Sequence, residues 1–338
     1  TVPLARVIAQ YQNDLPMPFK RYQIAPVWRA DNPQKGRYRE FYQCDVDVVG
    51  SDSLMADAEV MACLCKALEE LGIMNYELRY NNRLSLEGFL QEKKQFSDIV
   101  REIDKVDKIG QDEVLKNLIK KNIPNAAVVK VRKLFALGRG DEASRIFEGY
   151  GSGFKLLKSF IVANGVNGDN VVFDPTLARG LDYYTGTIFE IVLPDAPQYG
   201  SIAGGGRYDN LVGMFSGKQI PAVGGSIGID RLLSALEELE IIKYDLVSDV
   251  LVCNLDESLM EQYLNTAQQL REAGIKTDFY YETAKLDKQL KYADKKNINY
   301  AVIIGADEAK SGEATVKNLK TGKQERVKQK DLAKKLTK

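Results

Sequence analysis

Six arginines stand where the sequence pattern predicts strand ends or glycine-rich turns, and they are the side chains best suited to chemistry in this chain. They are Arg29, Arg37, Arg39, Arg179, Arg207 and Arg231. A guanidinium group binds carboxylate or phosphate through two parallel hydrogen bonds, so the set indicates a polyanionic substrate. For any one of these arginines taken alone, a solvated position is an equally good interpretation.

Histidine is absent from all 338 residues, which excludes a large group of mechanisms. Without an imidazole the chain cannot form a Ser-His-Asp triad, a Cys-His pair or a histidine general base. Any catalysis must therefore use arginine, lysine, carboxylates, hydroxyls or a metal. The P-loop pattern is also missing, and GGSIGID at 224–230 is a poor dinucleotide fingerprint, so a nucleotide would have to bind on an antiparallel sheet.

Four cysteines are too few and too scattered for a disulfide framework, and their spacing does not fit a zinc site. They are Cys44, Cys63, Cys65 and Cys253. Positions 63 and 65 do not share a face of the helix predicted there, so joint metal ligation is disfavoured and core packing is expected for both. We expect reduced thiols and no metal site built from protein ligands.

The length of the chain predicts two or three domains. A formal net charge of zero argues against a uniformly basic nucleic-acid binder, although residues 317–338 carry nine Lys or Arg against two Asp or Glu. Taken alone, that segment is best interpreted as a solvated terminal helix. No apolar run is long enough to cross a bilayer and no targeting pattern is visible from Thr1 onward, so we expect no membrane partner and a cytoplasmic location.

The segments that would position these side chains begin with two predicted antiparallel strands, at 21–30 and 40–50. In the second strand Cys44, Val46 and Val48 alternate with Asp45 and Asp47, which predicts one apolar and one acidic face. The polar segment between the strands predicts a long, basic hairpin loop. A helix capped by Ser51 or Ser53 and ending near Leu71, then a strand at 76–82, are expected next.

Later segments predict three domains. Residues 84–165 are rich in charged residues and broken by proline and glycine, which predicts a helical insertion. A strand pattern resumes at 171–193, residues 203–211 are interpreted as a glycine-rich turn, and 224–241 predicts a strand leading into a helix. Beyond Lys243 a β-α-β pattern predicts a separate α/β domain. The predicted fold is an α+β domain (1–83 and 166–243) built on an antiparallel sheet flanked by helices, the helical insertion (84–165) and the α/β domain (244–338).

Three segments resemble the motifs of class II aminoacyl-tRNA synthetases in their histidyl form. VWRADNPQKGRYREFYQCDVDVVG (27–50) is similar to motif 2, ARGLDYYTGTIFE (178–190) resembles the histidine-binding signature, and GGSIGIDRL (224–232) is similar to motif 3. The resemblance covers essentially the whole chain. It implies a class II catalytic domain followed by an anticodon-binding domain, and an enzyme that uses ATP to convert histidine to histidyl-adenylate and then loads it onto tRNA(His). The basic 317–338 segment would then contact phosphates.

The resemblance also implies an ATP site. Its positions are Arg29 at the α-phosphate, Phe41 and Arg231 on the two sides of the adenine, Arg231 near the terminal phosphates, and Asp31 and Arg37. Arg179 would bridge the amino-acid carboxylate and the α-phosphate. The expected catalytic residues are Arg29, Arg179 and Arg231, and Mg²⁺ is expected on the β- and γ-phosphates.

For histidine itself, the matching positions are Thr1 and Gln43 at the α-ammonium group, Asp47 and Tyr184 at the two ring nitrogens, Tyr183 in the wall, and Arg179 at the carboxylate. An acceptor and a hydroxyl spaced for an imidazole reject apolar side chains of similar shape, because those leave the polar groups unpaired. If Tyr183 and Tyr184 lie on a strand, only one of them can face the pocket.

The resemblance places the family's motif 1, which forms the dimer interface, ahead of Thr1, together with an acidic residue for the substrate ammonium group. A homodimer is expected when that segment is present. Two alternatives are a non-catalytic regulatory paralogue and a tRNA-sensing module. The α/β domain after Lys243 counts against the first, and retention of Arg29, Arg179 and Arg231 counts against the second.

Overall fold

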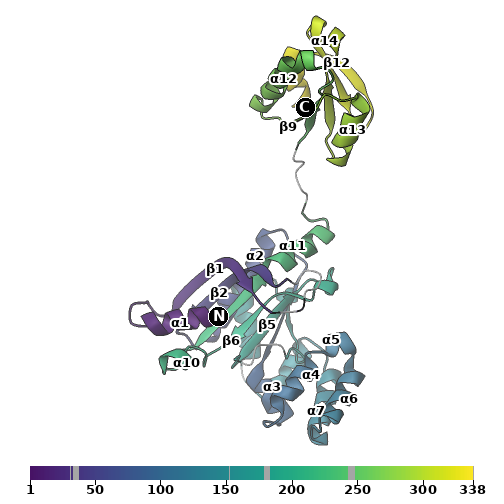
Figure 1. Ribbon diagram of the computed structural model, residues 1–338. Helices are drawn as coiled ribbons and strands as arrows, with labels where there is room; N and C mark the ends of the chain where they lie inside the picture. Colours follow the sequence, from purple (N-terminus) through teal and green to yellow (C-terminus); the bar gives the residue numbers. More distant parts are fainter. Residues whose placement is uncertain (31, 33–37, 152, 179–182, 243–247, 338) are drawn as a thin grey trace. The chain divides into compact units, whose positions relative to one another are not determined.

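The computed structural model describes residues 1–338 apart from 31, 33–37, 152, 179–182, 243–247 and 338. It divides into two compact units, Thr1–Ile242 and Lys243–Lys338 (Figure 1). Within the described residues, no helix is both long enough and apolar enough to cross a membrane.

A seven-stranded sheet forms the centre of the first unit. Its strands follow the order β1-β2-β7-β6-β5-β3-β4 and are antiparallel except for the β3–β4 pair. Their bounds are β1 Phe19–Trp28, β2 Glu40–Val49, β3 Glu77–Asn82, β4 Val171–Phe173, β5 Thr187–Val192, β6 Ser201–Arg207 and β7 Ala222–Gly228. The expected α+β unit built on an antiparallel sheet is confirmed, with one parallel pair at its edge.

Helix α2 (Leu54–Glu70) packs against β2, β5, β6 and β7. It begins as predicted, because the Ser53 hydroxyl accepts a hydrogen bond from the backbone N–H of Met55 at 3.2 Å. Buried α2 side chains share one hydrophobic core with Val48, and Cys44 and Val46 pack against that core. The acidic face of β2 therefore lies on the other side of the sheet, as its alternation predicted.

The described residues between β3 and β4 are helical, as expected. The helices are α3 Arg83–Leu90, α4 Phe96–Ile103, α5 Val106–Ile109, α6 Gln111–Lys120, α7 Asn125–Ala136, α8 Asp141–Phe147 and α9 Phe154–Ala163. Their buried side chains belong to the same hydrophobic cluster as the sheet, and α9 packs on α2. This helical segment therefore extends the core that supports the sheet.

A smaller core lies where the N-terminal helix α1 (Val2–Tyr11) meets α10 (Gly213–Ser216). It contains Leu4 and Ile8 of α1 together with Val49 and Tyr208, and Tyr183 and Tyr184 pack against it. Helix α1 was not predicted from the sequence. It holds Thr1, its N-terminal flanking residue, next to the polar face of the sheet.

Two predictions for the first unit were wrong. The glycine-rich segment expected to be a turn forms strand β6, and it contains glycine because its neighbours leave no room: a Cβ at Gly205 would lie 2.1 Å from the carbonyl oxygen of Gly224. Cys63, expected in the core, is exposed, whereas Cys65 is buried. Positions two apart on a helix face different directions, so only one of this pair faces the sheet.

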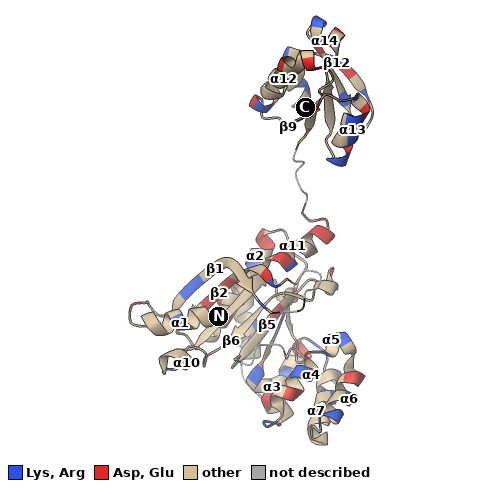
Figure 2. Cartoon of the chain, viewed as in Figure 1, with Lys and Arg blue, Asp and Glu red and all other residues tan. Residues whose placement is uncertain are grey.

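The second unit is an α/β domain, as predicted. Strands β8 Val250–Val252, β9 Thr277–Phe279 and β10 Tyr300–Ile303 pair in parallel, and β11 Glu313–Asn318 and β12 Gln324–Lys328 extend the sheet in antiparallel fashion, in the order β12-β11-β10-β8-β9. Helix α11 (Ile229–Glu238) lies near the end of the first unit. The helices of the second unit are α12 Met260–Glu272, α13 Leu286–Lys295, α14 Ala306–Ser311 and α15 Leu332–Leu336. The interpretation of 317–338 as a terminal helix is wrong for its first half, which belongs to the β11–β12 hairpin, and holds for the short helix α15. Lysines are also frequent on α13 (Figure 2).

Candidate functional site

Strand β2, which carries the acidic face, lies between β1 and β7 in the sheet. In register with Asp47 are Arg21 on β1 and Gly224 on β7, and in register with Gln43 are Ala25 on β1 and Gly228 on β7. Strand β7 thus places a glycine beside Asp47, whereas Ser226 lies beside Asp45. A ligand can approach the sheet closely there.

Two positions beside this face, Gly224 and Gly206, have no room for a side chain. A Cβ at Gly224 would lie 1.9 Å from Oδ1 of Asp47, and one at Gly206 would lie 2.6 Å from the carbonyl oxygen of Thr187 and 3.0 Å from the ring of Tyr184. Larger residues would displace the carboxylate and the tyrosine. The glycines of β6 and β7 therefore form the floor beneath these two side chains.

Asp47 is buried, with 4% of its surface exposed, and both of its oxygens have partners. The Arg21 guanidinium lies 2.8 Å from Oδ2, and the Tyr208 hydroxyl donates a hydrogen bond to Oδ1. Burial raises the pKa of Asp47 above its ordinary value, although the bonds from Tyr208 and Arg21 oppose that shift. The carboxylate is thus held in a fixed orientation in a poorly solvated place.

Tyr183 and Tyr184 precede β5 and do not belong to it, so the alternation of a strand does not apply to them. Their rings meet edge to face at 4.9 Å, and Tyr183 lies 6.0 Å from the Tyr208 ring. The Tyr183 hydroxyl donates to Oγ1 of Thr1 at 3.3 Å. Outside a strand, consecutive side chains need not alternate, so Thr1 and the three tyrosines gather on one side of Asp47.

Arg29, Phe41 and Gln43 also lie together. The Arg29 guanidinium stacks 5.1 Å from the centre of the Phe41 ring, and its Nη2 donates to Oε1 of Gln43 at 3.3 Å. Gln43 in turn donates to the Ser226 hydroxyl on β7 at 3.1 Å. Arg29 is exposed, so its remaining donors can reach an anion above the sheet.

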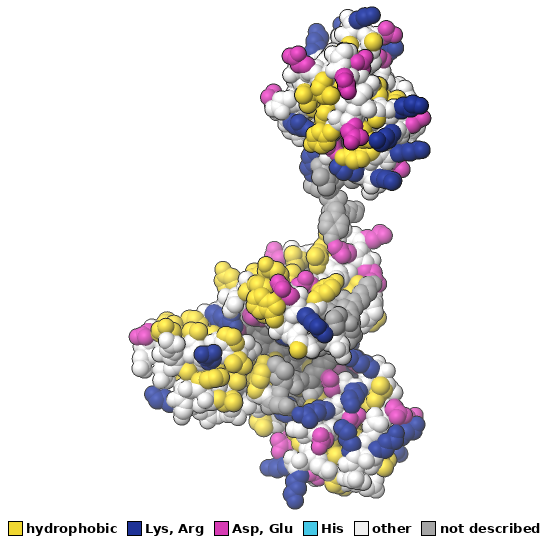
Figure 3. All heavy atoms as spheres, in the orientation of Figure 1, with side chains coloured by type: hydrophobic (Ala, Val, Ile, Leu, Met, Phe, Trp, Pro, Cys, Tyr) yellow, Lys and Arg dark blue, Asp and Glu magenta, His cyan; other side chains and the backbone are white. Residues whose placement is uncertain are grey.

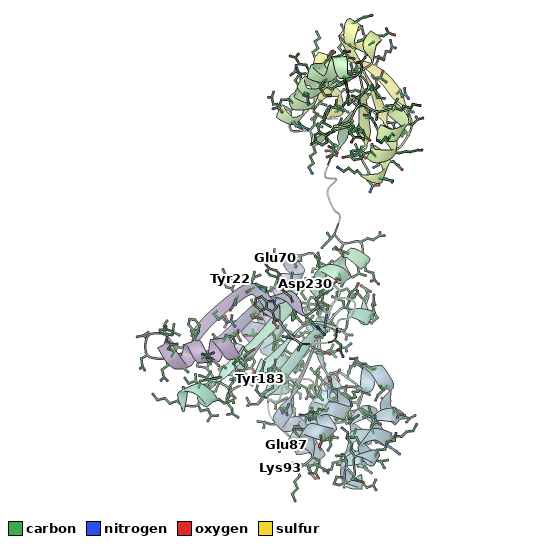
Figure 4. The ribbon with its side chains drawn as sticks, in the orientation of Figure 1. Tyr22, Glu70, Glu87, Lys93, Tyr183 and Asp230 are labelled. Atoms are coloured by element: carbon green, nitrogen blue, oxygen red, sulfur yellow. The ribbon has the colours of Figure 1, made fainter. Side chains whose placement is uncertain are left out.

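Arg231 projects from the first turn of α11 and donates through Nη1 to the carbonyl oxygen of Ser201 at 2.6 Å. Its neighbour Asp230, labelled at the start of α11 in Figure 4, accepts a hydrogen bond from the backbone N–H of Tyr42 at 2.7 Å. This bond fixes the start of α11 against β2. The structure pairs the Phe41 ring with Arg29, while Arg231 contacts β6.

The remaining predicted residues divide into two groups. Asp31, Arg37 and Arg179 lie outside the described residues. Arg207, one of the six arginines from which a polyanionic substrate was inferred, is buried and forms ion pairs with Asp57 and with Asp209 at 3.1 Å. It also donates to backbone carbonyls before α2, so it is structural and that interpretation of Arg207 was wrong.

Sequence reasoning missed four residues of this face: Arg21, Tyr208, Gly224 and Ser226. Arg21 could have been found only from the register of β1 on β2, which places it opposite Asp47. Tyr208 directly follows β6 and is distant in sequence. Among the described residues, no group of three or more Cys, Asp or Glu side chains could hold a metal ion.

Comparison with known proteins bears on this site and on the second unit. Residues 1–232 match the family model described as histidyl-tRNA synthetase, and residues 249–338 match the anticodon-binding domain. The chain is 40% identical to the histidine–tRNA ligase of Christiangramia forsetii, over 96% of this chain and 75% of that protein. Identity is 41% to the Flavobacterium johnsoniae ligase, over 96% and 72%. The solved histidyl-tRNA synthetase from Nostoc sp. PCC 7120 is similar over 100% of this chain and 82% of that one, with 36% identity and a TM-score of 0.74.

Proposed function

The chain belongs to the histidyl-tRNA synthetase family, and from that premise we propose that the acidic face of β2 is where it binds histidine and ATP. It is a histidine–tRNA ligase: it activates histidine with ATP and loads it onto tRNA. The observation that carries the assignment of the site is Asp47, a buried and oriented carboxylate above a glycine floor, on the same strand as Gln43 and Phe41.

Histidine is proposed to bind with its ring between Asp47 and Tyr184 and its α-ammonium group near Thr1 and Gln43. Tyr183 forms part of the wall. The contact between the Tyr183 hydroxyl and Thr1 supports this arrangement, because it brings together residues from both ends of the proposed site. Arg179 is proposed to bind the carboxylate of the substrate.

ATP is proposed to bind over Phe41, with Arg29 at the α-phosphate, Arg231 on the other side of the adenine, and Asp31 and Arg37 completing the site. Mg²⁺ is proposed to bind the β- and γ-phosphates of ATP. The stacking of Arg29 on Phe41 supports a joint role, since one ring can face the base while the guanidinium faces the phosphate.

The reaction fits a chain without histidine. The substrate carboxylate attacks the α-phosphorus, a new P–O bond forms, and pyrophosphate leaves with its bonding electrons. Charge accumulates on the phosphoryl oxygens, and Arg29, Arg179 and Arg231 would stabilise it without accepting a proton.

ATP–pyrophosphate exchange with each of the twenty amino acids tests this proposal. We expect exchange with histidine alone, and a fall in kcat of about 10²- to 10³-fold for Arg29→Ala, since one donor to the developing charge is lost. Arg179→Ala should also abolish activation while leaving tRNA binding largely intact. Arg145→Ala, which removes an exposed arginine of α8, is the control and should exchange normally. Exchange with another amino acid would overturn the assignment.

We further propose that residues 1–83 and 166–243 form the catalytic domain, 84–165 the insertion and 244–338 the anticodon-binding domain. The last of these argues against a regulatory subunit that lacks such a domain. A cytoplasmic location is proposed because charged tRNA is used in protein synthesis.

A homodimer is also proposed. Strand β1 lies at the edge of the sheet, and its side chains Tyr22, Ile24 and Trp28 are 77%, 62% and 68% exposed. Hydrophobic side chains gather on the surface of the first unit in Figure 3. Exposed apolar side chains along a sheet edge are typical of an interface. Analytical ultracentrifugation tests this: a monomer at all concentrations for a chain that includes motif 1 would contradict it.

A further inference from the structure

Arg21 is the charged residue of this face to which no role has yet been given. Its side chain is only 13% exposed; besides the ion pair with Asp47, its Nη1 donates to Gln23 at 2.7 Å. Its Nε is buried and has no hydrogen-bond partner among the described residues. Burying a guanidinium with an unsatisfied donor costs free energy, so its position is poorly explained by stability alone.

Several groups face Asp47, and they differ in charge. Arg21 comes from β1 and Tyr208 from the end of β6, while Gly224 on β7 offers no side chain. Tyr183 and Tyr184, in the segment before β5, and Asp45 on its own strand interact with Asp47 electrostatically. Arg29 is engaged farther along, with Gln43. Within the described part of the chain, Arg21 is thus the cation in direct contact with Asp47.

We propose that Arg21 makes this pocket select histidine with a neutral imidazole ring over histidine with a protonated one. The inference rests on the proposed placement of the ring between Asp47 and Tyr184. A lone buried carboxylate would attract an imidazolium as its counter-ion. With a guanidinium already 2.8 Å from Oδ2, the carboxylate is neutralised, and a second cation beside it is repelled.

A neutral ring satisfies both sides of the pocket. One ring N–H donates to Asp47 and the other nitrogen accepts from the Tyr184 hydroxyl. Tyr208 is a positioning residue in this arrangement, because its bond to Oδ1 fixes the plane of the carboxylate toward the ring. An imidazolium has two donors and no acceptor, so it cannot accept a hydrogen bond from the Tyr184 hydroxyl.

The first test measures KM for histidine by pyrophosphate exchange. Because imidazole titrates near pH 6.5, KM expressed as total histidine should rise about tenfold between pH 7.5 and about pH 5.5. Triazolylalanine, whose ring stays neutral over this range, should show no such rise. In Arg21→Gln the pH effect on histidine should fall below about threefold, and Arg21→Lys should restore it. A tenfold effect that persists in Arg21→Gln would overturn the proposal.

The second test observes the bound ring directly. Since the chain contains no histidine, every imidazole ¹⁵N resonance of a complex with labelled histidine belongs to the substrate. The ring should remain neutral in the wild-type complex at least one pH unit below its free pKa. A protonated ring in the wild-type complex near neutral pH would refute the proposal even if no variant folded.

Lys121→Gln is the matched control. It removes a cation 2.8 Å from the buried carboxylate of Glu102, in the helices between β3 and β4, and should leave the pH effect unchanged. A similar loss in this variant would mean that Arg21 acts only through stability, and would overturn the proposal. Failure of the proposed function would be distinguishable from failure of the Arg21 proposal, because the wild-type chain would then show no exchange with histidine at any pH.

Discussion

At the scale of single residues, the proposed pocket depends on glycines, which have no side chain, as much as on its polar side chains. Asp47 can lie between β1 and β7 because Gly224 has no side chain, and Tyr184 can approach β6 because Gly206 has none. The Asp47 carboxylate and the facing Gly224 therefore have to be recognised together. An aspartate or a glycine taken alone would not indicate a binding site.

Gly224→Ala should therefore damage the site selectively. The added methyl group would lie 1.9 Å from Oδ1 of Asp47, so the carboxylate must move away from Arg21 and Tyr208. We expect KM for histidine to rise at least about tenfold, which corresponds to about 1.4 kcal/mol of lost binding. Pyrophosphate exchange measures this.

Gly228→Ala on the same strand provides the control for that variant. Its Cβ would meet its nearest neighbours at 3.7 and 3.9 Å, which is ordinary contact. Near-normal exchange is expected, together with an unchanged melting temperature. Equal losses in the two alanine variants would show that β7 simply does not tolerate side chains.

The motifs predicted the types of the site residues but not their partners. Asp47 was expected at the ring, whereas its contact with Tyr208 joins residues 161 positions apart. Arg21 depends on the register of the β1–β2 hairpin, and a shift of one residue would turn it to the other face. Contacts of this kind are set by topology, which no local pattern contains.

At the scale of elements, the structure agrees with the prediction where a local signal was strong. Alternation predicted β2, and the serine cap predicted the start of α2. Local signals failed at β6, because a run of glycines indicates a turn unless close packing against Gly224 and Thr187 requires them in a strand. They also failed at Tyr183 and Tyr184, which were assigned to a strand that begins only at Thr187.

The helices between β3 and β4 are held in part by Glu102. Burial disfavours the charge on this carboxyl, yet hydrogen bonds from Lys105 and Lys121 hold the pKa of Glu102 below its ordinary value. A lowered folded-state pKa stabilises the fold above the unfolded-state value of 4.5, and this stability is lost as pH falls through the lower folded-state pKa.

Glu102→Gln should accordingly lower the free energy of unfolding by about 1 to 3 kcal/mol at neutral pH. The difference from wild type should shrink in acid, as the pH falls below 4.5 and through the lower folded-state pKa of Glu102. Urea unfolding at neutral and at acidic pH measures both effects. Glu113→Gln, at an exposed pair with Lys116, should change stability by less than about 0.5 kcal/mol, and a Glu102 effect that persists in acid would contradict the electrostatic explanation.

At the scale of the whole molecule, a net charge of zero conceals an uneven distribution. The β11–β12 hairpin exposes Lys320, Lys323 and Lys328, and the family match of the second unit is to an anticodon-binding domain. We therefore expect this hairpin to contact tRNA phosphates. Replacing these three lysines with glutamine should weaken tRNA binding and lower the slope of log K against log salt by about 2 to 3, with no change in pyrophosphate exchange.

Helix α13 supplies the comparison for that experiment. Lys288, Lys291 and Lys295 are also exposed, and their replacement removes the same charge from the same unit. Filter binding over a range of salt concentrations distinguishes the two surfaces. If only the α13 variant lost affinity, the basic 317–338 segment would not be the phosphate contact.

The strand order of the first unit has a consequence for how the protein is made. Strand β7 lies between β2 and β6 and completes the proposed histidine pocket, yet it begins at Ala222, long after β2 ends at Val49. At about 5 to 20 residues per second, a ribosome needs roughly 9 to 35 seconds to cover that interval. During this time β1 and β2 can pair with each other but not with the rest of the sheet, and two strands alone are marginally stable in water. A nascent chain therefore carries Asp47 and Arg21 well before it has a pocket, and the free edge of β2 has to be kept from pairing wrongly until translation passes Gly228.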